Sequence, residues 1–315
     1  MPAIFEQHPE IPNQFITKVN GISLFLKRED LLHPQVSGNK FRKLKYNLKN
    51  AIFEGYNTVL TFGGAYSNHI AATAAAAKES GLRSIGIIRG EELGQDMQQT
   101  LKENSTLNFA ASCGMQLHFV SRSDYRQKTS EEFLKLLQEQ FGNFYLVPEG
   151  GTNELAVKGC EEILSEEDKE FDIICCAVGT GGTISGLINA SAEGQKVLGF
   201  PALKGDFLTS EVEKFSEKNN WELITNYHFG GYAKVDRQLI EFINDFKSRF
   251  DVQLDPVYTG KMMFGIFDLM QNKKFKENTR ILAVHTGGLQ GIRGMNNQLK
   301  KKSLPQINVK DENHF

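Results

Sequence analysis

Residues 58–81, TVLTFGGAYSNHIAATAAAAKESG, have the pattern of a βα unit. Residues 58–62 are rich in strand formers and run into a pair of glycines. An alanine-rich stretch then continues to Ser80 and predicts a helix, which Gly81 would end. A strand followed by a helix usually continues into a second, parallel strand, and the helix forms a right-handed crossover between the two. These residues therefore predict an α/β fold with a parallel sheet.

The same alternation continues along the chain in two series. In the first, we expect further strands at 83–88, 116–120 and 144–147 and helices at 95–113 and 131–141. In the second, we expect strands at 172–178, 196–200 and 281–285 and helices from about 184 and at 211–218, 235–250 and 261–270. Two such series predict two three-layer αβα domains with mostly parallel sheets. The polar tail from residue 300 is expected to be frayed.

The order of the two series also predicts how the chain divides. A length of 315 residues is enough for two domains. We expect a small domain at 44–153, which contains the first series. The large domain is expected to combine 1–43 with 154–315.

The overall charge indicates no charged partner. Thirty-six basic and 38 acidic residues give a formal net charge of −2. Such a chain has no general attraction for nucleic acid or for an anionic membrane. The first 15 residues lack the basic start and apolar stretch of a signal peptide, and no segment reaches the about 18 apolar residues of a membrane span. We therefore expect a cytoplasmic protein.

The four cysteines, at positions 113, 160, 175 and 176, form no CxxC pair and no cluster with histidines. We therefore expect no metal site. Cys175 and Cys176 are neighbours on an expected strand, so their side chains would point to opposite faces and would not pair with each other. Buried reduced thiols are the simplest interpretation, and they suit a reducing compartment.

Three of the expected strands end in glycines, at 63–64, 179–183 and 286–288. Ligands of parallel sheets bind beyond the carboxyl ends of the strands, so these turns are candidate binding segments. Residues 179–183, GTGGT, lead into a helix and could hold a phosphate through converging N–H groups and the helix dipole. A plain turn without a ligand explains the pattern equally well. The chain has no P-loop, and Ile184 occupies the third glycine position of a dinucleotide fingerprint.

Two lysines lie in SGNKFRK, residues 37–43, where another helix is expected to begin. Lysines often decorate the exposed face of a helix, which is the simpler interpretation. The helix dipole disfavours a positive charge at a helix start, however, so Lys40 needs another reason to be there. A lysine with a lowered pKa is a candidate Schiff-base nucleophile. Lys43, one turn further on, could bind a phosphate by its charge.

Polar residues at the other turns are weaker candidates. Ser67 or Asn68 would cap the alanine-rich helix, and the serine hydroxyl with free N–H groups could instead hold a substrate carboxylate. Tyr232 follows a glycine pair, and Tyr258 precedes the helix expected from Lys261. A tyrosine is more often part of a core than a catalyst, so these two gain weight only beside the other segments.

Taken together and in order, these segments resemble those of pyridoxal-phosphate enzymes of the tryptophan-synthase-β fold class; they are SGNKFRK, GGAYSNH, GTGGT, GGY, DPVYTGK and HTGG. Within that class the chain resembles the family of D-cysteine desulfhydrase and 1-aminocyclopropane-1-carboxylate (ACC) deaminase, from about Lys27 to Gly288. The resemblance implies pyridoxal phosphate as cofactor, bound in the cleft between the two domains. It also implies a small amino-acid substrate and a homodimer.

The resemblance implies a role for each candidate residue. Lys40 would bind the cofactor as a Schiff base, Asn68 would bond to its ring oxygen, and Thr259 to its pyridine nitrogen. The phosphate would be held by Lys43 and by the turn residues Gly179, Thr180, Gly181, Gly182 and Thr183. The substrate would contact Ser67, Asn68, His69, Tyr232, Tyr258 and Thr286. Of these, Ser67 and the two tyrosines would be catalytic together with Lys40.

Two positions separate the two activities, and a third, His69, also matches one of them. By the resemblance, the deaminases carry Glu where this chain has Thr259 and Leu where it has Thr286, whereas the desulfhydrases carry Thr at both and His where it has His69. We therefore expect cleavage of D-cysteine to pyruvate, ammonia and hydrogen sulfide. A carboxylate beside the ring nitrogen keeps it protonated and makes the ring a stronger electron sink. Expelling a thiolate requires a weaker electron sink than opening a cyclopropane ring does. Two alternatives stay open: ACC deamination to 2-oxobutanoate and ammonia, and a binding protein that kept the fold without catalysis.

Overall fold

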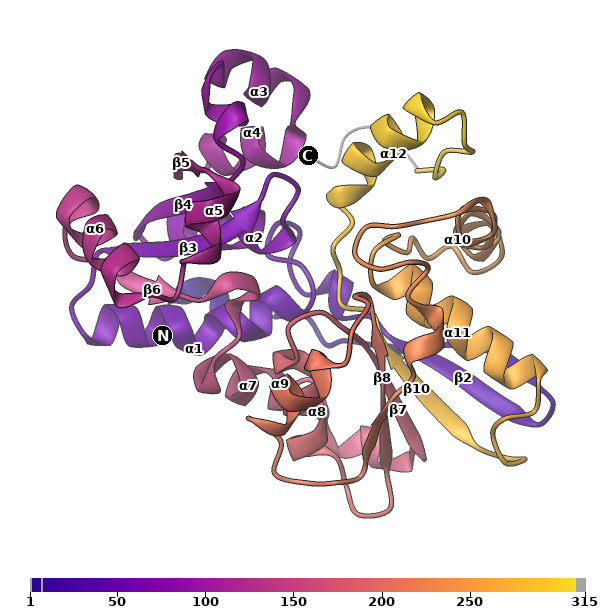
Figure 1. The fold of residues 1–315 in the computed structure, drawn as a ribbon. Helices are drawn as coiled ribbons and strands as arrows, with labels where there is room; N and C mark the ends of the chain where they lie inside the picture. Colours follow the sequence, from indigo (N-terminus) through magenta and orange to yellow (C-terminus); the bar gives the residue numbers. More distant parts are fainter. Residues whose placement is uncertain (1, 7, 310–315) are drawn as a thin grey trace.

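The computed structural model describes residues 2–6 and 8–309, and its strands form two separate sheets. The larger sheet has the strand order β1-β2-β10-β7-β8-β9, and the smaller has the order β5-β4-β3-β6. Neighbouring strands are parallel except for β1 and β2, which form an antiparallel hairpin. Figure 1 shows the two sheets as separate groups, each with its own helices. The predicted α/β class with mostly parallel sheets is confirmed.

The smaller sheet consists of β3 (Thr58–Gly64), β4 (Arg83–Arg89), β5 (Gln116–Val120) and β6 (Tyr145–Val147). Its helices are α1 (Asn39–Phe53), α2 (Asn68–Glu79), α3 (Met97–Glu103), α4 (Ser105–Ser112), α5 (Arg122–Arg126) and α6 (Glu131–Phe141). α1, α2 and α4 share one core with the sheet, and α5 and α6 share another. The small alanine side chains of α2 let it be buried between the sheet and its neighbouring helices.

The larger sheet consists of β1 (Asn13–Val19), β2 (Ile22–Lys27), β7 (Ile173–Val178), β8 (Lys196–Pro201), β9 (Trp221–Leu223) and β10 (Arg280–Val284). Its helices are α7 (Glu154–Glu161), α8 (Gly182–Ala190), α9 (Phe207–Glu213), α10 (Arg237–Phe250), α11 (Thr259–Gln271) and α12 (Gly291–Lys301). One core joins the sheet to α10, α11 and α12, and a second joins it to α7, α8 and α9. The connections include the short 3-10 turns η1 (Ala3–Phe5), η2 (Glu29–Leu31), η3 (Glu91–Gly94), η4 (Glu149–Gly151), η5 (Glu166–Glu170) and η6 (Thr225–Tyr227).

Three local predictions are wrong. The helix expected at 95–113 is two helices, because Asn104 adopts an extended conformation and caps α4 by accepting the Leu107 N–H at 3.0 Å. The helix expected at 211–218 lies at Phe207–Glu213. The tail is not frayed as far as residue 309, since Ile307 is buried and its backbone makes two hydrogen bonds to the Asn296 side chain. Residues 310–315 lie outside the described residues.

α1 packs against both parts of the chain. Its Phe41 and Leu44 belong to the core beneath the smaller sheet, while the helix also packs along α7. The strands of the smaller sheet all come from 58–147, and those of the larger sheet come from 13–27 and 173–284. The domain boundaries at 43/44 and 153/154 stay a prediction. α1 spans the first boundary and packs against elements of both sheets' parts of the chain.

The cysteines agree with the expectation of reduced, mostly buried thiols. All four are free, and three of them, Cys160, Cys175 and Cys176, are buried. Within residues 2–6 and 8–309, no helix is long and apolar enough to cross a membrane. In the same range, no group of three His, Cys, Asp or Glu side chains is arranged to hold a metal ion.

Gly38 determines how closely the turn before α1 approaches the loop after β10. Its φ is +62°, and a Cβ there would lie 2.1 Å from the Thr286 carbonyl oxygen and 2.6 Å from the Gly287 nitrogen. The Asn39 N–H donates to the same Thr286 oxygen at 3.4 Å. Only glycine allows this contact, because a side chain would force the two backbones apart.

We expect Gly38→Ala to lower the free energy of unfolding far more than Gly55→Ala. Gly55 also has a positive φ, +81°, but a Cβ there would meet nothing within 4 Å. Gly55→Ala should cost about 1 kcal/mol for its conformation alone, and Gly38→Ala about 1–3 kcal/mol more for the steric clash. Denaturant unfolding of the two variants measures the difference. Equal losses of stability would contradict the close approach.

Candidate active site

The glycine-ended strands bring their turns to one place. A Cβ on Gly288, in the loop after β10, would lie 2.4 Å from Asn68 Nδ2 and 3.6 Å from Asp255 Cγ. A Cβ on Gly179, after β7, would lie 3.1 Å from the Tyr258 ring. Segments that are far apart in the sequence therefore line one candidate site, and neither glycine could carry a side chain without displacing a predicted site residue or its support.

Lys40 is the second residue of α1 and is partly buried. Its Nζ lies 3.3 Å from Asn39 Oδ1, and Asn39 Nδ2 donates to Thr183 Oγ1 at 2.8 Å. Burial, together with the positive charge of Lys43, lowers the pKa of Lys40 to about 7. A large share of this amine is therefore unprotonated at neutral pH, as a Schiff-base nucleophile requires.

Lys43 is a buried ammonium group among neutral oxygens, with an exposed fraction of 2%. Its Nζ donates to Gly150 O at 3.1 Å, Thr152 Oγ1 at 2.8 Å and Thr180 Oγ1 at 3.4 Å. Throughout the described residues, no carboxylate forms an ion pair with it. Burial lowers the pKa of Lys43, because the charged form is poorly solvated. An anion at this point would stabilise the charge.

The turn 179–183 supplies further donors at the same point. α8 begins at Gly182, and a Cβ there would lie 3.3 Å from Lys43 Nζ. The hydroxyls of Thr180 and Thr152 lie 2.6 Å apart, and Thr183 is held by Asn39. The free N–H groups of a helix start, two hydroxyls and an ammonium group are a donor set that suits a phosphate.

The start of α2 also contributes to the candidate site. Ser67 caps the helix, and its Oγ accepts the Ile70 N–H at 3.4 Å. Capping was one of the two interpretations of this residue, and it leaves the hydroxyl proton available for a ligand. Asn68 places its amide against Gly288, the loop after β10.

His69 is buried, with an exposed fraction of 2%. The Thr61 hydroxyl lies 2.7 Å from His69 Nε2 and 2.8 Å from Val147 O. Burial and the charges of Lys40 and Lys43 hold the pKa of His69 well below its ordinary value, so the ring is neutral.

Tyr232 and Tyr258 form a tyrosine wall beside the 179–183 turn, with ring centroids 6.2 Å apart. Burial raises the pKa of both phenols, so each is protonated at neutral pH and can donate a hydrogen bond. The loop that carries Tyr232 is anchored from α11, since Lys261 Nζ donates to Gly231 O at 2.8 Å and to His228 O at 2.9 Å.

The two threonines expected to separate the activities are both buried. Thr259 begins α11, and its hydroxyl donates to the Asp255 carboxylate at 2.7 Å. Thr286 has an exposed fraction of 8%, and its carbonyl accepts the Asn39 N–H. Thr259 therefore lies beside the tyrosine wall, and Thr286 lies beside the turn that carries Lys40.

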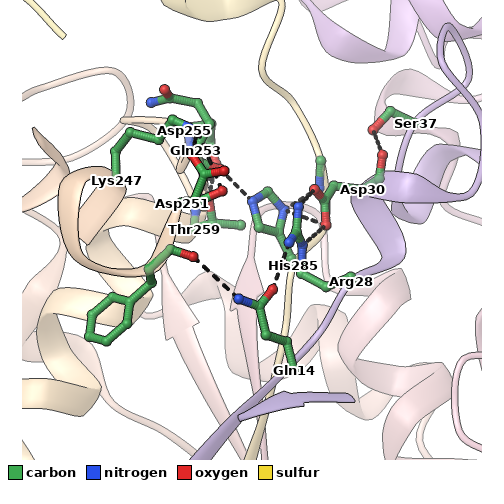
Figure 2. A network of polar contacts seen from close by, with 12 residues as sticks. Gln14, Arg28, Asp30, Ser37, Lys247, Asp251, Gln253, Asp255, Thr259 and His285 are labelled. Atoms are coloured by element: carbon green, nitrogen blue, oxygen red, sulfur yellow. Dashed lines mark hydrogen bonds and ion pairs between the residues drawn. The ribbon is translucent and has the colours of Figure 1, made fainter. Parts of the chain in front are cut away.

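A buried polar network supports these loops. Arg28 makes two hydrogen bonds to the Asp30 carboxylate, at 2.9 and 2.7 Å, and Ser37 donates to Asp30 O at 3.1 Å. His285 lies beside Asp30 and donates from Nε2 to Gln253 O at 2.7 Å. Figure 2 shows the resulting chain of contacts, with Asp255 and Thr259 next to Gln253. The network fixes the turn before Lys40 relative to the loop after β10 and the segment before α11.

A cavity of about 740 Å³ opens beside residues 64–66 of the small-sheet turn. Arg89, Tyr125 and Glu149 also line it, and the Tyr125 hydroxyl donates to Glu149 at 2.7 Å. The cavity lies at the carboxyl ends of β3 and β4, where parallel sheets bind ligands. The cavity therefore lies beside the 64–66 turn, and neither Ser67 nor Lys40 lines it.

Four residues that sequence reasoning missed contribute to the site. Asn39 joins Lys40 to the 179–183 turn, Thr152 contacts Lys43, Asp255 holds Thr259, and Lys261 anchors the Tyr232 loop. Asn39, Asp255 and Lys261 lie inside the quoted motifs, so proximity in sequence was the available signal. Thr152 lay outside those motifs, and only the fold brings it to Lys43.

A family model described as "Pyridoxal-phosphate dependent enzyme" matches residues 6–287. The chain belongs to this family. It is therefore an enzyme that uses pyridoxal phosphate, and the alternative of a binding protein without catalysis is not supported.

The names of similar proteins support a pyridoxal-phosphate-dependent elimination as the type of reaction. The "Bifunctional D-cysteine desulfhydrase/1-aminocyclopropane-1-carboxylate deaminase, mitochondrial" of Arabidopsis thaliana is 33% identical over 298 residues, which are 87% of this chain and 74% of that protein. The "D-cysteine desulfhydrase" of Klebsiella pneumoniae (strain 342) is 27% identical over 297 residues, 86% of this chain and 88% of that protein. The crystal structure of an "ACC deaminase homologue" has a TM-score of 0.77 and 29% identity and covers 93% of this chain and 94% of its own. The resemblance to the D-cysteine desulfhydrase and ACC deaminase family is confirmed.

The residues present fit the cofactor of this family. The unpaired ammonium of Lys43 and the start of α8 suit its phosphate, and the partly unprotonated amine of Lys40 suits its aldehyde. The individual site roles stay predictions, which two experiments test.

Lys40 should be the one lysine that borohydride links to the cofactor. Reduction of the yellow holoprotein followed by peptide mapping should label the peptide that contains Lys40, because a pKa of about 7 leaves much of this amine unprotonated at neutral pH. Lys40→Ala should still bind pyridoxal phosphate but leave no label. A label on any other lysine would contradict the assignment.

Lys43→Gln should weaken binding of pyridoxal phosphate while leaving binding of pyridoxal, which lacks the phosphate, nearly unchanged. A hydrogen bond from a charged donor contributes about 1.5–3 kcal/mol. Losing it would weaken the affinity for pyridoxal phosphate by about 10- to 150-fold. Fluorescence titration of the apoprotein with each compound measures both affinities. Lys45→Gln is the matched control, since Lys45 lies on the same helix and pairs with Glu162. An equal loss of affinity for pyridoxal would contradict the assignment of Lys43 to the phosphate.

Proposed function

We propose that this enzyme eliminates the β-thiol of D-cysteine and releases pyruvate, ammonia and hydrogen sulfide. The observation that supports the proposal most strongly is the Lys40 amine, because burial and the charge of Lys43 lower its pKa to about 7. The neighbouring Asn39 donates to Thr183 of the 179–183 turn. An amine with this pKa can both accept and return a proton near neutral pH.

When bound, pyridoxal phosphate supplies an electron-withdrawing ring that makes the α-proton of the substrate acidic. Lys40 would remove that proton. The N–H groups and the Ser67 hydroxyl at the start of α2 would hold the substrate carboxylate. Tyr232 and Tyr258, protonated at neutral pH, would donate hydrogen bonds to the substrate side chain, where the thiolate leaves.

The choice of D-cysteine over ACC rests on Thr259, Thr286 and His69. All three match the desulfhydrase side of the resemblance, and one relative carries the desulfhydrase name alone. The second candidate function is ACC deamination, which the name of the Arabidopsis thaliana relative supports together with desulfhydration. We also propose a homodimer, which light scattering would test.

The deciding assay gives D-cysteine and ACC separately to one preparation and measures sulfide, pyruvate and 2-oxobutanoate. We expect sulfide and pyruvate from D-cysteine and slower or no turnover of ACC. Lys40→Ala should lose about 10²- to 10⁴-fold in rate, as is typical when a general base is removed. Turnover of ACC without sulfide from D-cysteine would reverse the assignment.

The double variant Thr259→Glu and Thr286→Leu should move activity from D-cysteine toward ACC. The expected shift follows if these positions set the electron withdrawal of the ring and the shape of the pocket. The ratio of the two kcat/KM values measures it. A variant that loses D-cysteine turnover and gains nothing on ACC would locate the preference elsewhere, at Ser67 or the tyrosines.

A further inference from the structure

We propose that Lys261 is a positioning residue, which holds the loop 228–234 so that Tyr232 lies against Tyr258. The proposal rests on the proposed function in one respect, which is that Tyr232 acts on the substrate. The way in which the loop is held follows from contacts within the chain and needs no ligand.

The backbone around Tyr232 has an unfavourable conformation. Four residues of the loop have a positive φ: Phe229 at +54°, Gly230 at +90°, Gly231 at +116° and Ala233 at +53°. Glycine adopts such angles readily, but Phe229 and Ala233 carry a Cβ, and residues with a Cβ rarely do. A loop of this kind keeps its conformation only where contacts from outside it fix the backbone.

Lys261 supplies such contacts to both halves of the loop. Its Nζ donates to His228 O at 2.9 Å and to Gly231 O at 2.8 Å. The same two carbonyls accept the backbone N–H groups of Gly231, at 3.0 Å, and of Lys234, at 3.1 Å. One ammonium group therefore joins two successive turns. Lys261 has an exposed fraction of 2%, and bonds from a charged, buried donor are stronger than neutral ones.

The place of Lys261 in the chain needs a reason. It is the third residue of α11, where the helix dipole disfavours a positive charge. Throughout the described residues it forms no ion pair, and the Asp255 carboxylate is taken up by backbone N–H groups at the start of α11. Burial lowers the pKa of Lys261 to about 8, while the charge of Asp255 raises it, so most of the amine is charged at neutral pH. A buried cation whose hydrogen bonds all go to loop carbonyls is explained if it holds the loop.

Tyr232 depends on the loop for its position. Its exposed fraction is 48%, so packing alone does not fix the side chain. Tyr258, whose ring centroid lies 6.2 Å away, is the N-cap residue of α11, the helix that carries Lys261. The ammonium group therefore fixes one tyrosine of the wall relative to the other. Phe229 also attaches the loop to α11, through an edge contact with Phe264 at 5.1 Å between ring centroids.

The first test compares hydrogen–deuterium exchange of the holoenzyme with that of its Lys261→Met variant. Methionine has a similar length but donates no hydrogen bond, and the Phe229 contact stays in place. We expect the amides of 228–234 to exchange about tenfold faster or more, because the loop loses two bonds from a charged donor. The amides of α11 beyond its first turn should keep their protection. Unchanged exchange in the loop would overturn the proposal.

Lys247→Met is the matched control. Lys247 lies on α10 and donates to the Asp251 carboxylate at 2.8 Å, so this variant also loses a bond from a charged donor, but away from the loop. It should leave the exchange of 228–234 unchanged. Where Lys261→Met does not fold, Lys261→Gln, which keeps a neutral donor, answers the same question by whether exchange in the loop rises or stays as it was.

The second test measures whether Lys261 acts through Tyr232. Lys261→Met should lower kcat/KM for D-cysteine about tenfold or more. In the Tyr232→Phe background the same change should cost less than about twofold, because the hydroxyl to be positioned is already gone. Losses that multiply in the double variant would contradict the proposal, since Lys261 would then act independently of Tyr232.

The two tests separate this inference from the proposed reaction, because the exchange measurement needs no substrate. Faster exchange of the loop in Lys261→Met, in an enzyme that releases no sulfide from D-cysteine, would reject the proposed reaction and retain the role of Lys261 in holding the loop. Sulfide release by the unaltered enzyme, together with unchanged loop exchange in the variant, would retain the reaction and reject the role of Lys261.

Discussion

The buried ammonium of Lys43 is the constraint around which the site is organised. It is linked to Gly150 and Thr152 after the smaller sheet and to Thr180 after β7 of the larger one, so one cation holds loops from both parts of the chain. These neutral oxygens do not compensate its charge, and burying an uncompensated charge is costly. The cost is accounted for if the site exists to bind an anion, and the same cation helps to lower the pKa of Lys40, one turn earlier on α1.

Two glycines let the surrounding loops come close enough to use this charge. Gly38 allows the turn before Lys40 to touch the Thr286 carbonyl, and Gly288 lies between Asn68 and Asp255. The network from Arg28 and Asp30 to His285 then fixes the loops from behind (Figure 2). The reactive groups are thus positioned by rigid loops whose backbones could not approach in this way if either glycine carried a side chain.

The sequence was sufficient for the βα units, because each strand and helix there has its own periodicity and its own stop signal. It was also sufficient to bring together the motifs around Lys40, Asn68, Thr180, Tyr258 and Thr286. The N-terminal hairpin was missed although Asn20-Gly21, both with positive φ, is a strong turn signal between β1 and β2. The break at Asn104 was missed because a cap inside a helical pattern depends on tertiary packing. The contacts of Thr152 with Lys43 and of Asp255 with Thr259 could be identified only from the three-dimensional structure, because hydrogen-bond partners produce no periodic pattern in a sequence.

The central claim is that Lys43 and the 179–183 turn hold the cofactor phosphate as a buried dianion. The most direct measurement is ³¹P NMR of the holoenzyme as the pH is varied through the neutral range. A phosphate monoester in water takes up its second proton with a pKa of about 6. We expect a bound signal whose shift does not change across that range, because the ammonium and the start of α8 stabilise the dianion. A signal that titrates like the free phosphate would contradict it.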